Sequence, residues 1–418
     1  MNERLERLIV RARTPQWVGW WLPLAIFAIS RVIDVILVIA YSHTQGAIIH
    51  GEKIEYVEEA KFPADPGYLK MLTNWDGQWY QSIAHHGYPS YLTLDQFGHV
   101  QMNQWAFFPL FPALTRLVMF VTADNFALAA TIVSTICAGL AMVLLFRMVR
   151  ESGGLFLATI SVVSLSVSPA ALVFQAAYSE GPALLLIVTC LWLLRRQKYG
   201  WLLVAGVTLS LARPVVGALA IVIAIHWFHR RRTDAGFTKR QQIWVAFVCG
   251  VIGLSFFLWI AVCGLVVGHS NAYQLTQDAW AGWKWDQTSM RWDSWLYGIV
   301  EFKPSGLIAL GLLIYFIWLV RRPAASGYGA ELRLWAPIYA FYVLAATRVT
   351  PSVVRYLMLV AIPWWPVPAC ADWSLRERRA RIAILLTVLV GVFLQYAWIE
   401  SCFVVSTDKF WGLFHGYP

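Results

Sequence analysis

The residues best suited to chemistry lie in one short segment around Asp76. Apolar side chains recur there at helical spacing and predict an amphipathic helix over 71–86 on the outer surface of a membrane. They are Trp75, Trp79 and Ile83. Asp76 lies at the polar edge of this helix, where a carboxylate can take a proton from an attacking hydroxyl. A helix cap or an interfacial anchor would use the same residues, so spacing alone leaves both roles open.

Two histidines follow in the same segment. His85 and His86 are possible metal ligands together with Asp76 or His99. Their spacing matches no known metal site, and interfacial histidines are usually polar surface. We therefore expect no metal and no other cofactor.

Three arginines at the outer ends of predicted helices are candidates for phosphate binding. A guanidinium can grip a phosphate through two parallel N–H donors. These residues are Arg213, Arg348 and Arg355. The alternative is that they snorkel to lipid headgroups. Glu180 follows Ser179 at another helix start, where the helix dipole alone would favour a carboxylate.

Two further sets of residues allow both a structural and a functional interpretation. The aromatic and charged band from Trp280 to Asp293, which includes Trp283, could anchor an interfacial helix or stack on a sugar. Arg31 and Asp34 lie about one turn apart in the first apolar segment. Charges inside a membrane are costly and usually pair, so mutual pairing is the simpler interpretation and support of a site the other.

The composition indicates which elements position these residues. Only 13% of the 418 residues are charged and 59% are hydrophobic, whereas an average soluble domain has about 25% charged residues. Long apolar runs recur throughout and predict an all-α, polytopic integral membrane protein with about eleven membrane helices. We place these helices near 17–42, 126–149, 155–169, 179–195, 200–213, 214–228, 242–267, 305–320, 333–348, 354–370 and 382–404.

The basic residues orient the chain. Most of the 33 Lys and Arg residues fall in short segments that share one side if the N-terminus is cytoplasmic. This distribution excludes a nucleic-acid-binding patch, although the net charge is +10. It leaves two outer loops, about 43–125 and about 268–304, within one domain, 1–418. Residues 107–121 are apolar, but a span there would invert every later loop, so we expect a helix lying at the outer interface.

The sequence resembles a known family. The run from Asn74-Trp75-Asp76 to Gly87-Tyr88, followed by 106–112 (AFFPLFP), resembles the PIG-V family of mannosyltransferases. The segment 168–180, Arg213, and Arg355-Tyr356-Leu357 resemble its later blocks. The resemblance covers about residues 30–365 and implies the GT-C fold, a lipid-phosphate-linked sugar donor and a catalytic acid in the first outer loop. Asp76 lies in that loop.

From the resemblance and these residues together we form a hypothesis about the reaction. The expected reaction is inverting transfer of mannose from polyprenyl-phosphate mannose to a lipid-linked or envelope glycoconjugate. Asp76 would be the base, and Arg355, assisted by Arg213 or Arg348, would bind the donor phosphate. The sugar and acceptor would meet Trp75, His86, Gln104, Tyr178, Glu180, Trp283 and Asp293, with Arg31 and Asp34 in support.

Two departures leave the acceptor and the sugar open. Gly77-Gln78-Trp79 follows the aspartate, and Arg213 is followed by Pro214, where the family has other residues. The compact loops favour a bacterial cytoplasmic membrane, with the active site on its outer face; the endoplasmic reticulum is the alternative. The rival functions are transfer of another polyprenyl-phosphate sugar, a transporter or lipid flippase, and a non-catalytic membrane scaffold whose outer loops bind a partner. A transporter would be expected to show inverted repeats, and none is visible.

Overall fold

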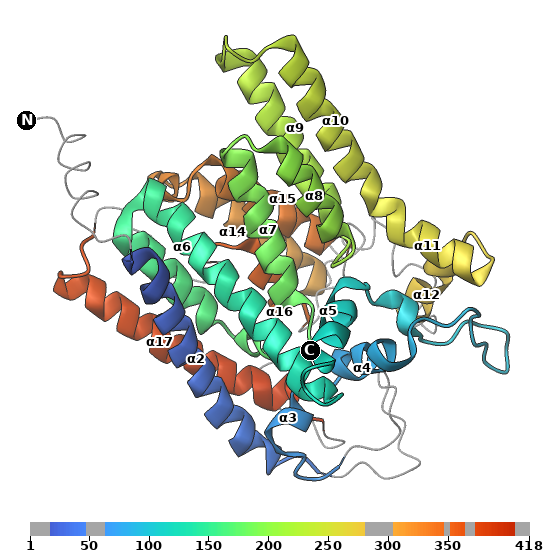
Figure 1. Ribbon diagram of the computed structural model, residues 1–418. Helices are drawn as coiled ribbons and strands as arrows, with labels where there is room; N and C mark the ends of the chain where they lie inside the picture. Colours follow the sequence, from blue (N-terminus) through green and yellow to red (C-terminus); the bar gives the residue numbers. More distant parts are fainter. Residues whose placement is uncertain (1–16, 47–62, 281–303, 347–351, 364–372, 406–418) are drawn as a thin grey trace, which may run out of the picture.

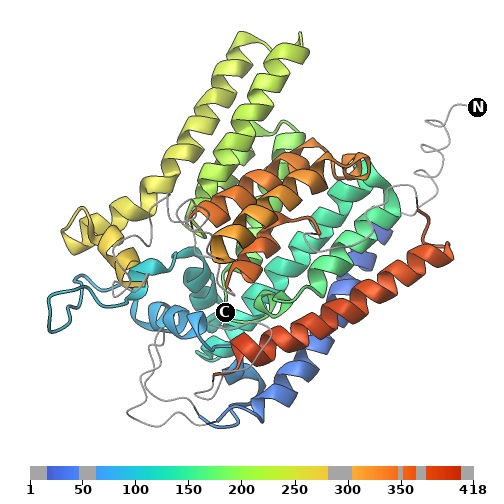
Figure 2. The ribbon, with the colours of Figure 1, turned by 180° about the vertical axis from the view of Figure 1, so that it is seen from behind.

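The computed structural model describes residues 17–46, 63–280, 304–346, 352–363 and 373–405. In these ranges every regular element is a helix apart from one isolated bridge between Leu94 and Val100. The α-helices are α2 (Val18–Ser42), α3 (Gly67–Met71), α4 (Asp76–His86), α5 (Leu110–Met119), α6 (Phe126–Ser166), α7 (Glu180–Arg195), α8 (Tyr199–Ser210), α9 (Val216–Thr233), α10 (Lys239–Leu254), α11 (Leu258–Val267), α12 (Ala272–Trp280), α14 (Pro304–Arg321), α15 (Ala330–Ala346), α16 (Ser352–Leu357) and α17 (Arg378–Trp398). Figures 1 and 2 show them from two sides, and the all-α prediction is confirmed.

Four helical stretches in the described residues are long and apolar enough to cross a membrane. They are Val18–Ser42, Phe126–Ser166, Lys239–Val267 and Arg378–Phe403. Large apolar side chains such as Ile29 on α2 and Phe393 on α17 face outward rather than into the core. Such surfaces need lipid around them, because water would be in contact with continuous apolar area. Other apolar helices are shorter, so the number of about eleven spans stays a prediction.

Helix α6 forms the centre of the fold, packing against α2, α5 and α7. It bends at Gly154, whose φ of 83° suits glycine because no Cβ clashes there. After this bend the chain runs back along the first arm of α6. The Ser134 hydroxyl in that arm donates to the carbonyl of Ala176, which follows the second arm, at 2.7 Å. The two predicted helices 126–149 and 155–169 therefore correspond to the two arms of α6.

Helix α5 lies within the segment 107–121. Its 10 residues rise only about 15 Å, half of the ~30 Å that a membrane core requires. It packs against α4 and α6. The prediction that this segment is a helix without being a span agrees with that length.

Several predicted helices differ from the structure in their bounds; the helix expected over 214–228, for example, is α9 and extends to Thr233. Two further differences have a clear cause in the backbone. The helix expected over 71–86 begins only at Asp76, because Trp75 takes a φ of 60° that no α-helix contains. The helix expected over 354–370 ends at Leu357 and continues only as a 3₁₀ turn to Val360. The helical turns end there because Ala361 takes a φ of 61°, which no α-helix contains.

Candidate functional site

Four charged side chains from distant parts of the chain form one buried cluster. Arg355 Nη1 lies 2.5 Å from Asp76 Oδ2 and 3.4 Å from Glu180 Oε1. Arg213 Nη1 lies 2.5 Å from the same oxygen of Glu180. Glu180 is fully buried, whereas 20% of the Asp76 side chain remains exposed. Burying four charges carries a desolvation cost, so the cluster is a candidate for a function rather than for stability.

The two carboxylates occupy equivalent places in the fold. Asp76 is the first residue of α4, and Glu180 is the first residue of α7. The helix dipole favours a negative charge at such a position. Arg213 lies in the turn between α8 and α9, and Arg355 lies in α16. Four separate elements therefore bring opposite charges to one place.

The start of α4 is held by the residues just before it. The indole Nε1 of Trp75 donates to the carbonyl of Phe403 at 2.8 Å, and the Asn74 amide donates to Gln45 Oε1 at 2.9 Å. These bonds fix Trp75 in a backbone conformation that costs about 1–3 kcal/mol for a residue with a side chain. The asparagine and tryptophan of this motif thus anchor the segment that presents Asp76.

The segment before α7 packs directly on the start of α4. The backbone N–H of Ala177 donates to the carbonyl of Leu72 at 2.9 Å. A Cβ at Gly77 would lie 3.2 Å from the Cβ of Ala177, closer than ordinary contact. Only a glycine fits this approach without a shift, which gives Gly77 a packing role beside Asp76.

Helix α7 begins against α6 in a similarly close contact. A Cβ at Gly181 would lie 2.6 Å from the carbonyl oxygen of Ser134. The hydroxyl of Ser134 donates to the carbonyls of Ala176 and Tyr178. This contact fixes the backbone on both sides of Glu180.

Aromatic rings line the two arginines. The Arg355 guanidinium lies 5.0 Å from the ring centroid of Tyr178 and 4.9 Å from that of Tyr356, and Arg213 lies 4.9 Å from the Tyr356 ring. Cation–π contacts of this kind hold a guanidinium without using up its hydrogen-bond donors. Tyr178 was a predicted site residue. Tyr356 was not, although its place directly after Arg355 was a signal.

Burial alters the acidity of Asp76. Loss of water raises the pKa of its carboxyl above the ordinary value, and the charge of Arg355 opposes that rise. A carboxylate with a raised pKa is a stronger base than a free aspartate. The electrostatics therefore suit proton abstraction once Arg355 is drawn away.

Arg31 and Asp34 pair with each other, at 2.6 Å. Arg31 also donates to the carbonyls of Ala171 (2.8 Å) and Ser166 (2.9 Å), and Asp34 accepts from Gln395 at 2.6 Å. These bonds tie α2 to the chain that leads toward Tyr178. The prediction of mutual pairing is confirmed, and the pair lies outside the four-charge cluster.

Other predicted site residues lie elsewhere. His86 is exposed at the last position of α4, about 15 Å along the helix from Asp76. The Gln104 amide donates to the Ser82 hydroxyl at 3.2 Å. The predicted residues Trp283, Asp293 and Arg348 fall outside the described ranges.

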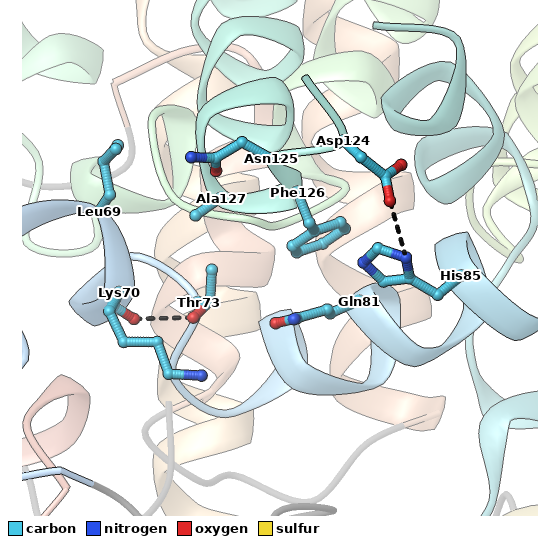
Figure 3. A pocket seen from close by; sticks show the side chains of 9 residues that line it. All are labelled: Leu69, Lys70, Thr73, Gln81, His85, Asp124, Asn125, Phe126 and Ala127. Carbon is cyan, nitrogen blue, oxygen red and sulfur yellow. Dashed lines mark hydrogen bonds and ion pairs between the residues drawn. The ribbon is translucent and has the colours of Figure 1, made fainter. Parts of the chain in front are cut away.

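A polar hollow of about 290 Å³ opens beside α3 and α4, next to the turn before α6. Figure 3 shows His85 pointing at Asp124 across it, with 3.9 Å between Nδ1 and Oδ2. His99 instead lies beside Asp95. The described residues contain no group of three or more side chains that could hold a metal ion.

Comparison with known proteins found similarity to solved structures, and to no family model or curated protein. The archaeal oligosaccharyltransferase AglB from Archaeoglobus fulgidus, in complex with an inhibitory peptide and a dolichol-phosphate, is 12% identical, with a TM-score of 0.43 over 92% of this chain and 56% of that chain. The apo form of the Archaeoglobus fulgidus oligosaccharyltransferase is 12% identical, with a TM-score of 0.44 over 91% and 56%. This chain thus spans little more than half the length of the structures it matches.

Proposed function

We propose that this chain is a membrane glycosyltransferase of the GT-C kind. In this proposal it transfers mannose from polyprenyl-phosphate mannose to a lipid-linked or envelope glycoconjugate on the outer face of the membrane. The observation that carries the proposal is the pair formed by Asp76 and Arg355, at 2.5 Å, beside Glu180 and Arg213. In the proposal, the carboxylate of this pair is the base and the neighbouring guanidinium binds the donor phosphate. The resemblance of the Asp76 segment to PIG-V mannosyltransferases adds the sugar and the lipid.

The proposed step is an inverting displacement. The Asp76 carboxylate takes the proton of the acceptor hydroxyl, and the acceptor oxygen attacks the anomeric carbon of the mannose. The bond between that carbon and the phosphate oxygen breaks, and its electron pair leaves with the polyprenyl phosphate. Arg355, assisted by Arg213, stabilises the additional negative charge on this leaving group. The exposed part of Asp76 lets the proton pass to water afterwards.

The pairing of Asp76 with Arg355 implies an order of events. While Arg355 holds Asp76, the carboxylate is a poor base because the opposite charge stabilises it. A donor phosphate competes for Arg355, whose Nε has no hydrogen-bond partner in the described part of the chain. Glu180 keeps hold of both arginines during the exchange. Donor binding therefore frees Asp76 to act on the acceptor.

The deciding experiment compares wild type with Asp76→Asn. Each purified protein is reconstituted in lipid and supplied with radiolabelled polyprenyl-phosphate mannose and an envelope lipid extract. We expect the mutant to form about 10²–10⁴-fold less labelled product, because general-base catalysis contributes that much. Asp124→Asn is the matched control, since Asp124 is an exposed aspartate that pairs with Arg116 outside the cluster. It should keep wild-type activity.

Each outcome assigns a different function. Equal product from wild type and Asp76→Asn would remove Asp76 from the mechanism. In a second outcome, wild type fails to use the mannose donor but uses a glucose or pentose donor. That result would support the same type of transfer reaction with a different sugar. Failure to bind any such donor would favour a transporter or flippase.

A further inference from the structure

A short hairpin between α4 and the 3₁₀ turn Gln104–Ala106 exposes three large apolar side chains. Backbone bonds pair its arms, with Gln101 N–H donating to the Thr93 carbonyl at 2.8 Å. Tyr91 is 69% exposed, Leu94 54% and Phe97 72%. Figure 1 shows the hairpin projecting from the body of the protein beyond α4. We call these three side chains the hairpin tip.

The turn that carries the tip is well ordered by its own hydrogen bonds. Asp95 Oδ1 accepts from the backbone N–H groups of Phe97 (2.8 Å) and His99 (2.9 Å). Gly98, with a φ of 83°, closes the turn through a bond to the Asp95 carbonyl. Satisfied backbone groups are a requirement for any segment that approaches lipid. The apolar side chains are therefore presented by a built turn and not by a frayed loop.

The root of the hairpin packs on the end of a membrane-length helix. Trp259 of α11 lies 4.8 Å from the ring of Tyr88 and 5.1 Å from the ring of Trp105. Its indole N–H donates to the Trp105 carbonyl at 3.2 Å. Leu92 packs against the same cluster, together with Val262. Helix α11 completes the stretch Lys239–Val267, so the hairpin root packs along the last part of that stretch.

Lipid is the occupant that this position favours. Near its end α11 itself exposes Leu265 (83%) and Val266 (47%), so the helix that packs on the hairpin root also has an apolar outer surface. We propose that Tyr91, Leu94 and Phe97 insert into the leaflet of the membrane that lies nearer to α4. An apolar surface with tyrosine at its edge is typical of the boundary between lipid and water. This proposal does not depend on the proposed enzyme activity.

Site-directed fluorescence tests the insertion. The full chain carrying Phe97→Cys, labelled with an environment-sensitive dye, is placed in lipid nanodiscs, which leave both faces open to solutes. We expect shallow doxyl-labelled lipid to quench the dye and iodide in the water to have little effect. Thr233→Cys, exposed at the end of α9 beside three arginines, is the control and should show the reverse. Wild type treated in the same way supplies the background.

The other outcomes overturn the proposal. Quenching by iodide as strong at Phe97→Cys as at Thr233→Cys would place the tip in water. Protection from both quenchers would mean that protein covers the tip, either another part of this chain or a second copy. If Phe97→Cys does not fold, Leu94→Cys supplies the same measurement. In the protein labelled at Leu94→Cys, the double substitution Tyr91→Ser and Phe97→Ser should abolish the quenching by lipid.

Discussion

Two clusters of buried charge in this protein are built from the same kinds of residue and differ in what their arginines hold. Arg31 donates to two backbone carbonyls and pairs with Asp34, which is fully buried. In the described structure, the hydrogen bonds of the Arg355 guanidinium all go to side chains, those of Asp76, Glu180 and Tyr356. Backbone carbonyls in packed helices cannot turn away, whereas side chains can. The first cluster is therefore fixed, and the second can exchange a partner for a ligand.

Exposure separates the two aspartates in the same way. Asp34 of α2 is fully buried against Gln395 of α17, whereas Asp76 keeps 20% of its side chain accessible. A sealed ion pair can fasten helices but cannot meet a substrate. An accessible ion pair can fasten helices and also meet a substrate. This comparison predicts that mutations in the first cluster act on stability and that mutations in the second act on substrate binding and turnover.

Removal of Arg31 should give the largest loss of stability. Arg31→Met leaves the Asp34 carboxylate buried without its cation, which typically costs ~3–5 kcal/mol. Thermal unfolding in detergent measures the effect. Arg116→Met is the control, because Arg116 pairs with Asp124 at an exposed site, where ion pairs contribute ~0–1 kcal/mol. Equal losses from both variants would contradict a structural role for the Arg31 pair.

Removal of Arg355 should act mainly on the donor. Arg355→Met deletes charge-assisted bonds of about 1.5–3 kcal/mol, so the donor KM should rise about 10- to 150-fold. The kcat should also fall, because Arg355 stabilises the leaving phosphate in the proposed reaction. Stability should fall less than in Arg31→Met, since Glu180 keeps Arg213 and Asp76 reaches water. Donor titration and thermal unfolding of the same preparation separate the two effects. A large loss of stability with an unchanged KM would make this cluster a second structural anchor.

The pH dependence of kcat/KM should report the environment of Asp76. Its pKa is raised by burial, and in the proposed reaction the carboxylate is the form that takes the proton. The rate should therefore fall on acidification, and the fall should begin above the pH at which an ordinary aspartate, with a pKa of about 3.9, titrates. Asp124→Asn should leave this profile unchanged. A rate that stays flat down to the ordinary range would mean that Asp76 does not act as the base.

Features set by local sequence could be predicted, whereas contacts between distant helices could not. Hydropathy placed α2, and a spacing of one turn predicted the pairing of Arg31 with Asp34, since both features are local. Asp76, Arg213 and Arg355 were predicted site residues, and the structure brings them together. That Glu180 would bridge two arginines could not be predicted, because it depends on how α7, α9 and α16 pack.

Local backbone exceptions were also missed. Asn74-Trp75-Asp76 follows a helical pattern, yet Trp75 leaves the helix because its indole binds the Phe403 carbonyl. That partner lies 328 residues away in sequence. A pattern within the segment contains no information on such a contact.

The smallest effect should come from Gly77→Ala. Its Cβ would lie 3.2 Å from the Cβ of Ala177, so α4 must shift by a few tenths of an ångström, at a cost of ~1–3 kcal/mol for overpacking. Because Asp76 is the preceding residue, the shift should lower kcat more than it changes the donor KM. Gly217→Ala is the matched control, since a Cβ there meets nothing within 4 Å. If both variants leave kcat unchanged, the close approach of α4 to Ala177 fastens the helices without setting the position of Asp76.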